Sequence, residues 1–329
     1  MTEPRRADDA PHADSVEEEQ VKDPALAPAE GVEAAPRAEE PGVLTERPRG
    51  LLRLGWETFA ENRLALVGLG IIVLAILFCY IGPLVYPTDQ VHTHLVNANL
   101  PPGGGHPLGT DQVGYDQLGR LMYGGQASLE VGIAAAVIAT VFGTLWGAVA
   151  GYAGGILDAV MMRLVDGMLA IPSLFILLIL TVIFRPSVGT MIILIAFFEW
   201  LGASRLVRGE ALSLRVREYV QAVKVMGGGG TRAVLRHIAP NAIGTVVVFA
   251  TFSVANAIIL LSSLGFLGLG IQPPQTDWGG MLSNGTTYLY SGYWWLIYPP
   301  GIAIVLVVLA FNFLGDALRD AFEGRLRQR

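Results

Sequence analysis

The stretch that decides the fold is Leu64–Leu84, LALVGLGIIVLAILFCYIGPL, which runs for 21 residues without a charged side chain. A helix needs about 20 apolar residues to cross the hydrocarbon core of a bilayer. Five further apolar segments have a similar length: Leu129–Tyr152, Leu164–Phe184, Val188–Val207, Ala242–Leu264 and Leu296–Leu314. The sequence therefore predicts an all-α membrane protein with six transmembrane helices.

The overall composition agrees with this class. Of 329 residues, 52% are hydrophobic and 15% are charged, whereas a soluble domain has about 25% charged residues. The net charge of -6 comes from residues 1–50, which hold thirteen acidic and six basic side chains and few large apolar ones. Such a segment cannot bury enough apolar surface to fold. We expect a disordered acidic tail over residues 1–50, either a solvated extension or a regulatory segment, and a membrane domain over residues 51–329.

The basic residues indicate the orientation, because loops on the cytoplasmic side of a membrane are enriched in Lys and Arg. With both termini in the cytoplasm, sixteen basic residues from Arg47 onward fall on the inner side, and only Arg120 and Arg185 fall on the outer side. This orientation predicts long outer loops at about 85–127 and 265–295. It also predicts a long cytoplasmic loop at about 208–240.

The cytoplasmic loop contains a patterned stretch, RVREYVQAVKVMGGGGTRAVLRHIAPN, from Arg215 to Asn241. Five apolar residues repeat there at helical spacing: Val216, Tyr219, Val220, Val223 and Met226. Four glycines then end the helix and allow the chain to reverse. In a second short helix Val234, Leu235 and Ile238 share one face. Two amphipathic helices joined by a flexible corner outside the bilayer indicate a docking site for a soluble partner.

Motifs for catalysis or cofactor binding are missing from the sequence. It contains no GxxxxGK[ST] phosphate loop, no HExxH, no CxxC and no GxSxG, and its single cysteine is Cys79. His92 and His94 form a pair in an outer loop, where we interpret them as solvated rather than as metal ligands. We therefore predict no catalytic residue, no metal site and no cofactor bound by this chain.

Two polar residues within the spans are candidates for a transport pathway. Glu199 lies in the fourth span, where a carboxylate is costly and normally faces a cavity or a partner. It either lines a pathway or pairs with a nearby base such as Arg205. Asn256 in the fifth span either lines the pathway or forms an interhelical hydrogen bond.

Other residues predict how the spans bend and pack. Pro172 in the third span predicts a kink or a 3₁₀ step. Gly143, Gly147 and Gly151 recur every fourth residue in the second span and predict a close helix contact. Arg163 and Asp166 are three residues apart at the entry to the third span, where they can pair on one helix face.

Four long, collinear blocks resemble the inner-membrane permease subunits of binding-protein-dependent ABC importers. The likeness is to the second permease, the C-type subunit, of the dipeptide, oligopeptide and nickel branch. The blocks are His106–Gly132, Gly154–Leu174, Ser204–Asn241 and Leu264–Leu282. The resemblance implies a type I ABC importer transmembrane domain in the bacterial cytoplasmic (inner) membrane, with cytoplasmic coupling helices.

The third block is similar to the EAA loop of that family, EAA-x3-G-x9-I-x-L-P. Ala222, Gly227 and Pro240 match it, whereas Gln221 replaces the glutamate. The resemblance implies that this loop inserts into a cleft of a cytoplasmic ATPase subunit. The implied ATPase-coupling residues are Arg217, Glu218, Tyr219, Val220, Gln221, Ala222 and Gly227.

The resemblance further implies half of a pathway for dipeptides or oligopeptides, with ATP and Mg²⁺ on partner subunits. The implied partners are a homologous second permease, two ATPase subunits, an extracytoplasmic substrate-binding protein, the peptide and membrane lipid, but no nucleic acid. An importer of nickel or another small solute is an alternative within the class. A secondary transporter or channel that works alone is an alternative outside it, and that class requires more charged pairs within the spans.

Overall fold

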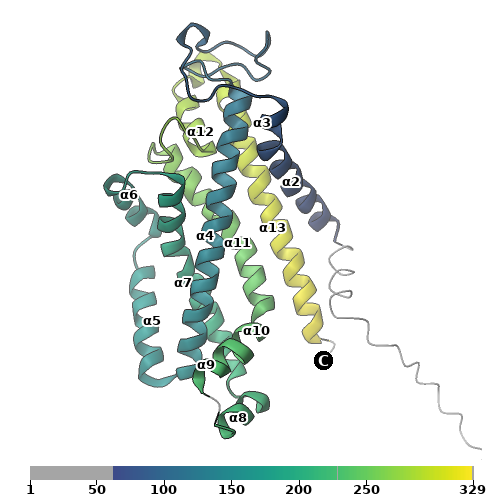
Figure 1. Ribbon diagram of the computed structural model, residues 1–329, viewed down its shortest axis with the longest axis vertical. Helices are drawn as coiled ribbons and strands as arrows, with labels where there is room; N and C mark the ends of the chain where they lie inside the picture. The colour runs from purple at the N-terminus through teal and green to yellow at the C-terminus, as the bar shows by residue number, and fades with distance from the viewer. Residues whose placement is uncertain (1–61, 228, 328–329) are drawn as a thin grey trace, which may run out of the picture. The chain divides into compact units, whose positions relative to one another are not determined.

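A computed structural model describes residues 62–227 and 229–327 of the chain. The tail expected over residues 1–50 lies outside this part. The described residues form helices and loops, with two isolated β-bridges in place of any strand (Figure 1).

Within the described residues, five helices are long and apolar enough to cross a membrane. They are α2 (Arg63–Tyr80), α4 (Gln117–Ala153), α7 (Val188–Leu214), α11 (Ile243–Phe266) and α13 (Tyr298–Arg327). A sixth crossing is possible if α5 (Gly155–Leu169) and α6 (Ser173–Ile183) together count as one broken span. The short helix α3 (Gly82–Val85) follows α2 after a break at Ile81 and covers the end of the first predicted span.

The break between α5 and α6 confirms a bend at Pro172 and corrects the shape of the third span. The two helices meet at 79°, so no continuous helix covers Leu164–Phe184. Pro172 has an extended ψ of 123° and precedes α6 as its cap. A proline lacks the N–H that an uninterrupted helix needs and its ring clashes with the preceding turn, which is why the helix ends here.

Helices α4 and α7 are packed unusually closely, and the small residues of α4 explain why. A Cβ atom added at Gly143, Gly147 or Gly151 would lie within 3.0 Å of backbone atoms of α7. The atoms that it would meet belong to Trp200, Ser204 and Arg208. The predicted close contact is therefore confirmed, since only glycine permits this backbone separation.

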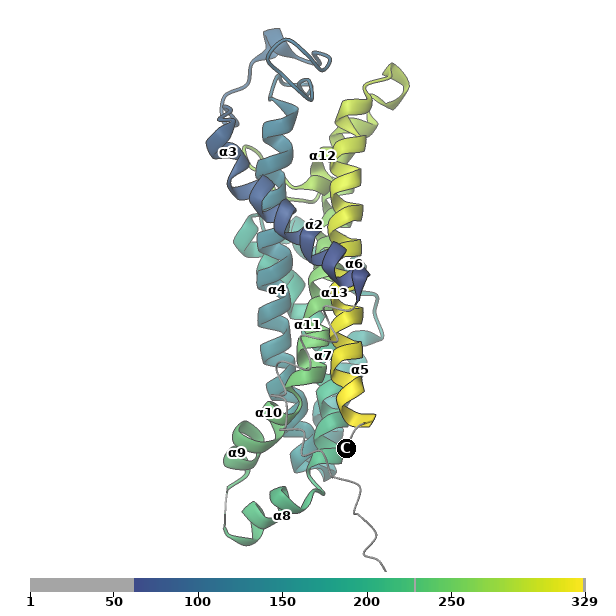
Figure 2. The same ribbon diagram turned by 90° about the vertical axis from the view of Figure 1, so that its right-hand side faces the viewer.

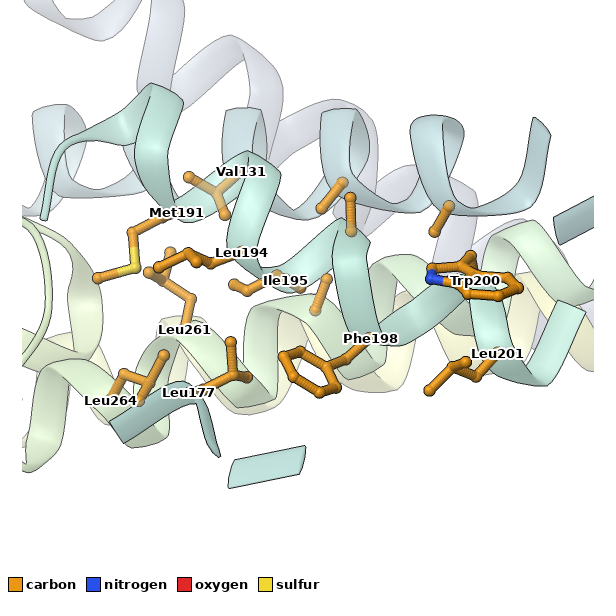
Figure 3. Packing of buried hydrophobic residues seen from close by; sticks show 14 of the residues in the cluster. Val131, Leu177, Met191, Leu194, Ile195, Phe198, Trp200, Leu201, Leu261 and Leu264 are labelled. Carbon is orange, nitrogen blue, oxygen red and sulfur yellow. The ribbon is translucent and has the colours of Figure 1, made fainter. Parts of the chain in front are cut away.

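The larger hydrophobic cluster joins α4, α5, α6, α7 and α11, and Figure 3 shows part of it. Val131, Leu177, Ile195 and Leu261 each come from a different one of these helices and are fully buried. Other apolar side chains face outward, including Leu84, Ile156 and Val182, which are 81%, 85% and 72% exposed. Such extensive exposed apolar surface is unusual for a soluble monomer and fits a surface covered by lipid or by another subunit.

The ends of the long helices differ in character (Figure 2). Residues 86–116 and 267–297, which include α12 (Trp278–Thr286), lie at one end, which we call the loop end. Helix α4 begins at Gln117, so the predicted loop over 85–127 is shorter by about three helical turns. Asp116 caps α4 by accepting a hydrogen bond from the Gly119 N–H at 2.9 Å. The opposite end, which we call the basic end, contains α8 (Glu218–Val225), α9 (Gly230–Ala233) and α10 (Ala239–Asn241).

The two loop segments are joined to α4 and to each other by indole and guanidinium donors. The Trp278 indole N–H donates to the Leu121 carbonyl at 3.0 Å, and the Trp295 indole N–H donates to the Thr110 carbonyl at 3.2 Å. Arg120 donates to the Pro274 carbonyl at 2.8 Å. Both aromatic side chains are buried, so the loop end is an ordered layer rather than a set of independent loops.

Candidate coupling surface and pathway residues

The patterned stretch at the basic end forms two short helical segments with a glycine corner between them, as the sequence predicts. Helix α7 extends to Leu214, so the loop begins at Arg215 rather than near residue 208. Gly227 has a φ of +77°, a backbone conformation that residues with a Cβ seldom adopt. The second segment contains α9, a five-residue π-helical turn over Val234–Ile238, and α10.

The second helical segment fixes the loop to the long helices. Val234 and Ile238 are 5% and 0% exposed and pack in one cluster with Ala148, Val207 and Ala211 of α4 and α7. Leu235, which was expected on the same face, is 54% exposed. The buried pair therefore anchors the loop, and Leu235 is left on its outer side.

Helix α8 presents an exposed surface that is rich in apolar side chains. Val216, Val225 and Met226 are 67%, 86% and 77% exposed. We call this surface the coupling face; its exposed residues are Val216, Arg217, Glu218, Tyr219, Gln221, Ala222, Val225, Met226 and Gly227. These side chains lie outside the helices that qualify as spans, so apolar exposure here indicates a contact surface for another protein.

Val220 is the exception among the predicted coupling residues. Its side chain is only 2% exposed, so it faces back toward the chain rather than outward. The sequence pattern could not separate Val220 from Val216 and Met226, because all of them fit one helical periodicity. Val220 is buried, and the other six predicted residues lie on the coupling face.

Gln221 holds a structural position that explains its departure from the EAA pattern. Its side-chain amide donates a hydrogen bond of 2.8 Å to the Arg215 carbonyl, at the end of α7. A glutamate carboxylate is only an acceptor when ionised and cannot make this bond. The rings of Tyr219 and His237, 6.3 Å apart, form a second contact between the two halves of the loop.

Glu199 does not pair with Arg205, and this part of the expectation is wrong. Arg205 instead forms an ion pair with Asp166 of α5, and the expected pairing of Asp166 with Arg163 is not present among the described residues. Glu199 is half-buried on α7, and no described residue gives it a hydrogen bond or an ion pair. Its carboxylate is therefore available to a group outside the described part of the chain.

Asn256 likewise has no hydrogen bond to any described residue, and its side chain is exposed on α11. The expected interhelical hydrogen bond is thus not present within the described chain. Thr245 of α11 donates to Glu210 of α7 at 3.1 Å and sets the register of these antiparallel helices. Glu199 lies eleven residues before Glu210 and Asn256 eleven residues after Thr245, each about 16.5 Å along its helix. Both candidate residues therefore lie at a similar level.

A charged contact that the sequence did not predict holds α5 against α7. Arg208 donates two hydrogen bonds to the Asp158 carboxylate, at 2.6 and 2.7 Å. Arg215, just after α7, donates a separate hydrogen bond of 3.3 Å to the Gly151 carbonyl of α4. Asp158 and Arg208 lie 50 positions apart in the sequence. The only sequence signal for this pair is the opposite charge of two segments that both lie near the basic end.

Two histidines of the loop end, His92 and His94, contact a single carboxylate. His92 Nδ1 lies 2.9 Å from Asp89 Oδ2, and His94 Nε2 lies 3.7 Å from the same atom. Hydrogen bonds from the backbone and side chain of His92 hold the pKa of Asp89 well below its usual range. Among the described residues, no group of three or more His, Cys, Asp or Glu side chains is arranged to hold a metal ion.

Comparison with known proteins agrees with this arrangement. Residues 143–328 match the family described as binding-protein-dependent transport system inner membrane component. Residues 50–102 match the N-terminal transmembrane domain of oligopeptide transport permease C.

Three similar proteins are permeases of peptide transport systems. The dipeptide permease DppC of Bacillus subtilis is 39% identical over 83% of this chain and 85% of its own length. The oligopeptide permease OppC of Escherichia coli K12 is 41% identical over 82% of this chain and 89% of its own length. The dipeptide permease DppC of the same strain is 42% identical over 83% of this chain and 93% of its own length. The chain therefore belongs to the family of inner membrane components of binding-protein-dependent transport systems.

Proposed function

We propose that this chain is the second permease of a type I ABC importer and forms half of a pathway for dipeptides and oligopeptides. The observation that carries the proposal is the coupling face on α8, which follows directly from the spanning helix α7. An apolar surface outside the spans has an unfavourable contact with water unless a partner covers it. The peptide substrate rests on the similarity to the dipeptide and oligopeptide permeases.

The proposed topology has six spans, counts α5 and α6 as one broken span and has both termini in the cytoplasm. The excess of basic residues on one side of the spans supports it. In this orientation residues 51–329 form the transmembrane domain, the basic end is cytoplasmic and the loop end is extracytoplasmic.

The proposed partners follow from this topology. Two ATPase subunits, which bind ATP and Mg²⁺, meet the coupling faces of this permease and of a homologous second permease. An extracytoplasmic substrate-binding protein meets the loop end. The chain itself is a non-catalytic subunit, because ATP hydrolysis takes place in the partners.

Coupling requires that a movement of α8 reaches the spans. The Gln221–Arg215 hydrogen bond ties α8 to the end of α7, and Val234 and Ile238 tie the second segment to α4 and α7. Closure of the ATPase dimer would shift α8 and α7 together. ATP then drives transport because the coupling face makes different contacts in the two states. Glu199 and Asn256, both without partners among the described residues, are the candidates for lining the pathway.

The test is purification of the complex through this chain in mild detergent, followed by reconstitution in liposomes. We expect two ATPases and a second permease to copurify, and ATP-dependent uptake of radiolabelled dipeptide once the binding protein is added. Uptake by the purified chain alone would instead identify a secondary transporter or channel. ATP-dependent uptake of nickel without peptide uptake would reject the peptide assignment.

A further inference from the structure

A cavity of about 340 Å³ opens at the loop end of the chain. One wall is a single face of α4, formed by Tyr123, Gln126, Ala127 and Glu130. Residues 88–91, Val188 and Pro274–Thr276 form the remaining walls. Sites for small ligands range from about 300 to 1,000 Å³, so this cavity is large enough for a small substrate.

Among the described residues that line the cavity, the positively charged side chain is that of Arg120, which already contacts other protein groups. Arg120 donates to the Pro274 carbonyl at 2.8 Å, lies 3.8 Å from the Asp111 carboxylate and covers the ring of Tyr115 at 4.4 Å. With these partners its charge is largely compensated. A free anion therefore finds no open counter-charge among the described lining residues.

One acceptor in the lining, in contrast, is open to the cavity and lacks a partner within the described chain. The Glu130 side chain is exposed and has no hydrogen bond or ion pair with a described residue. Gln90 is only 9% exposed, its Nε2 donates to Thr88 and to the Asp116 carbonyl, and its Oε1 is buried out of reach of a ligand. An unpaired carboxylate accepts its strongest hydrogen bonds from cationic N–H donors. The cavity therefore favours a ligand that carries a positive charge and N–H donors.

The length and chemistry of the cavity fit a peptide better than a metal ion. From Tyr123 to Glu130 the α4 wall runs for about 10.5 Å, which matches roughly three residues of an extended peptide. Gln126 and Gln275 place amide groups along the lining. Gln126 Nε2 donates to the Cys79 carbonyl at 2.7 Å, which leaves its Oε1 as an acceptor for a peptide N–H. Among the described residues, no cluster of His, Cys, Asp or Glu side chains that could hold a metal ion lines the cavity.

We infer that this cavity binds the amino-terminal end of a short peptide, with Glu130 as the counter-ion of the α-ammonium group. The inference rests on the proposed import function and adds a substrate contact on this chain. Glu130 lies farther along α4 from the loop end than Tyr123 does, so the amino terminus enters first. The cavity therefore binds peptides with a free α-ammonium group more tightly than peptides whose amino terminus is blocked. This selection takes place before the peptide reaches the level of Glu199.

The test measures equilibrium binding of radiolabelled trialanine and of N-acetyl-trialanine to the complex purified through this chain, without the substrate-binding protein. For the unaltered chain we expect trialanine to bind roughly tenfold more tightly than its acetylated form, as for loss of one hydrogen bond to a charged group. Glu130→Gln should weaken trialanine binding by about the same factor and remove the preference. Asp320→Asn, which neutralises an exposed carboxylate of α13 outside the cavity lining, should bind both peptides like the unaltered chain.

Other outcomes would overturn the inference. These are equal affinities of the unaltered chain for the two peptides, or a preference that persists in Glu130→Gln. The inference is also overturned if Glu130→Gln weakens docking of the substrate-binding protein but not binding of free trialanine. In that case a side chain of the binding protein, and not a peptide, would occupy the cavity. ATP-dependent uptake by the unaltered complex tests the import function separately. If the complex takes up peptide but binds trialanine and N-acetyl-trialanine equally, only the inference about the cavity is rejected. If the complex takes up no peptide, the proposed import function is rejected.

Discussion

The Arg208 guanidinium of α7 donates two parallel hydrogen bonds, of 2.6 and 2.7 Å, to the Asp158 carboxylate of α5. Helix α5 has only three buried residues, and Asp158 is one of them. An ion pair with this fork geometry is among the stronger polar contacts in proteins. The other two buried residues, Met162 and Val165, belong to the larger hydrophobic cluster. The position of α5 therefore depends on this pair together with apolar packing.

Asp158→Asn should lower the stability of the α5–α7 contact by about 1.5–3 kcal/mol, because the charged acceptor is lost. Thermal unfolding of the purified complex in detergent measures this change. Asp166→Asn is the matched control: its pair with Arg205 is about half exposed, and exposed pairs contribute only about 0–1 kcal/mol. A larger effect at Asp166 than at Asp158 would contradict the assignment, and the exchange Asp158→Arg with Arg208→Asp should recover part of the loss.

Gly147→Ala should disrupt the contact between α4 and α7. The added Cβ would meet the backbone carbonyl of Ser204 and the backbone N–H of Arg208, which cannot move aside as a flexible side chain can. We expect a loss of about 1–3 kcal/mol from overpacking, measured as a lower unfolding temperature and a lower yield of folded protein. Gly167→Ala in α5 is the control, since its Cβ would meet nothing within 4 Å and alanine favours helix by about 0.8–1.0 kcal/mol.

The coupling face predicts different results for two apolar residues of one helix. Val225→Glu adds charge at an 86% exposed position, so the chain should fold normally but bind the ATPase poorly. Copurification of the ATPase and peptide-stimulated ATP hydrolysis should both fall. Val220→Glu places a carboxylate at a 2% exposed position, where burial without a partner is costly, so it should lower the stability of the chain itself. Normal ATPase binding by Val225→Glu would count against the coupling face.

Gln221→Glu should weaken the link between α7 and α8, although it restores the residue of the EAA pattern. The variant loses the donor to the Arg215 carbonyl, and a neutral hydrogen bond contributes about 0.5–1.5 kcal/mol. We expect ATP hydrolysis to continue while the number of peptides imported per ATP falls. Gln221→Leu lacks the donor without adding charge and should show the same defect. If only the glutamate variant is impaired, repulsion from the carbonyl rather than loss of the hydrogen bond is responsible.

Much of the fold was predictable because it depends on local composition. The apolar runs predict the spanning helices, the small residues from Gly143 to Gly151 predict the close contact of α4, and Pro172 predicts a bend. The angle of that bend and the early start of α4 at Gln117 were not predictable. They depend on contacts with residues remote in the sequence, such as the Trp278 and Arg120 hydrogen bonds that order the loop end.

The candidate coupling site shows the same division. Periodicity located α8 and the glycine corner, but it could not show that Val220 is buried while Val225 and Met226 are exposed. That distinction depends on which side of α8 faces the rest of the chain. A helical pattern defines faces but does not say which of them another segment covers.

The sequence by itself determined that this is a membrane protein with a basic, patterned loop, because hydrophobic length and charge are properties of each segment alone. Only the tertiary structure decided that Arg208 binds Asp158, that Arg205 binds Asp166, and that Glu199 is left without a partner among the described residues. The physical reason is helix register. Which charges meet depends on how far α5 and α7 slide past each other, and packing across the whole helix sets that offset.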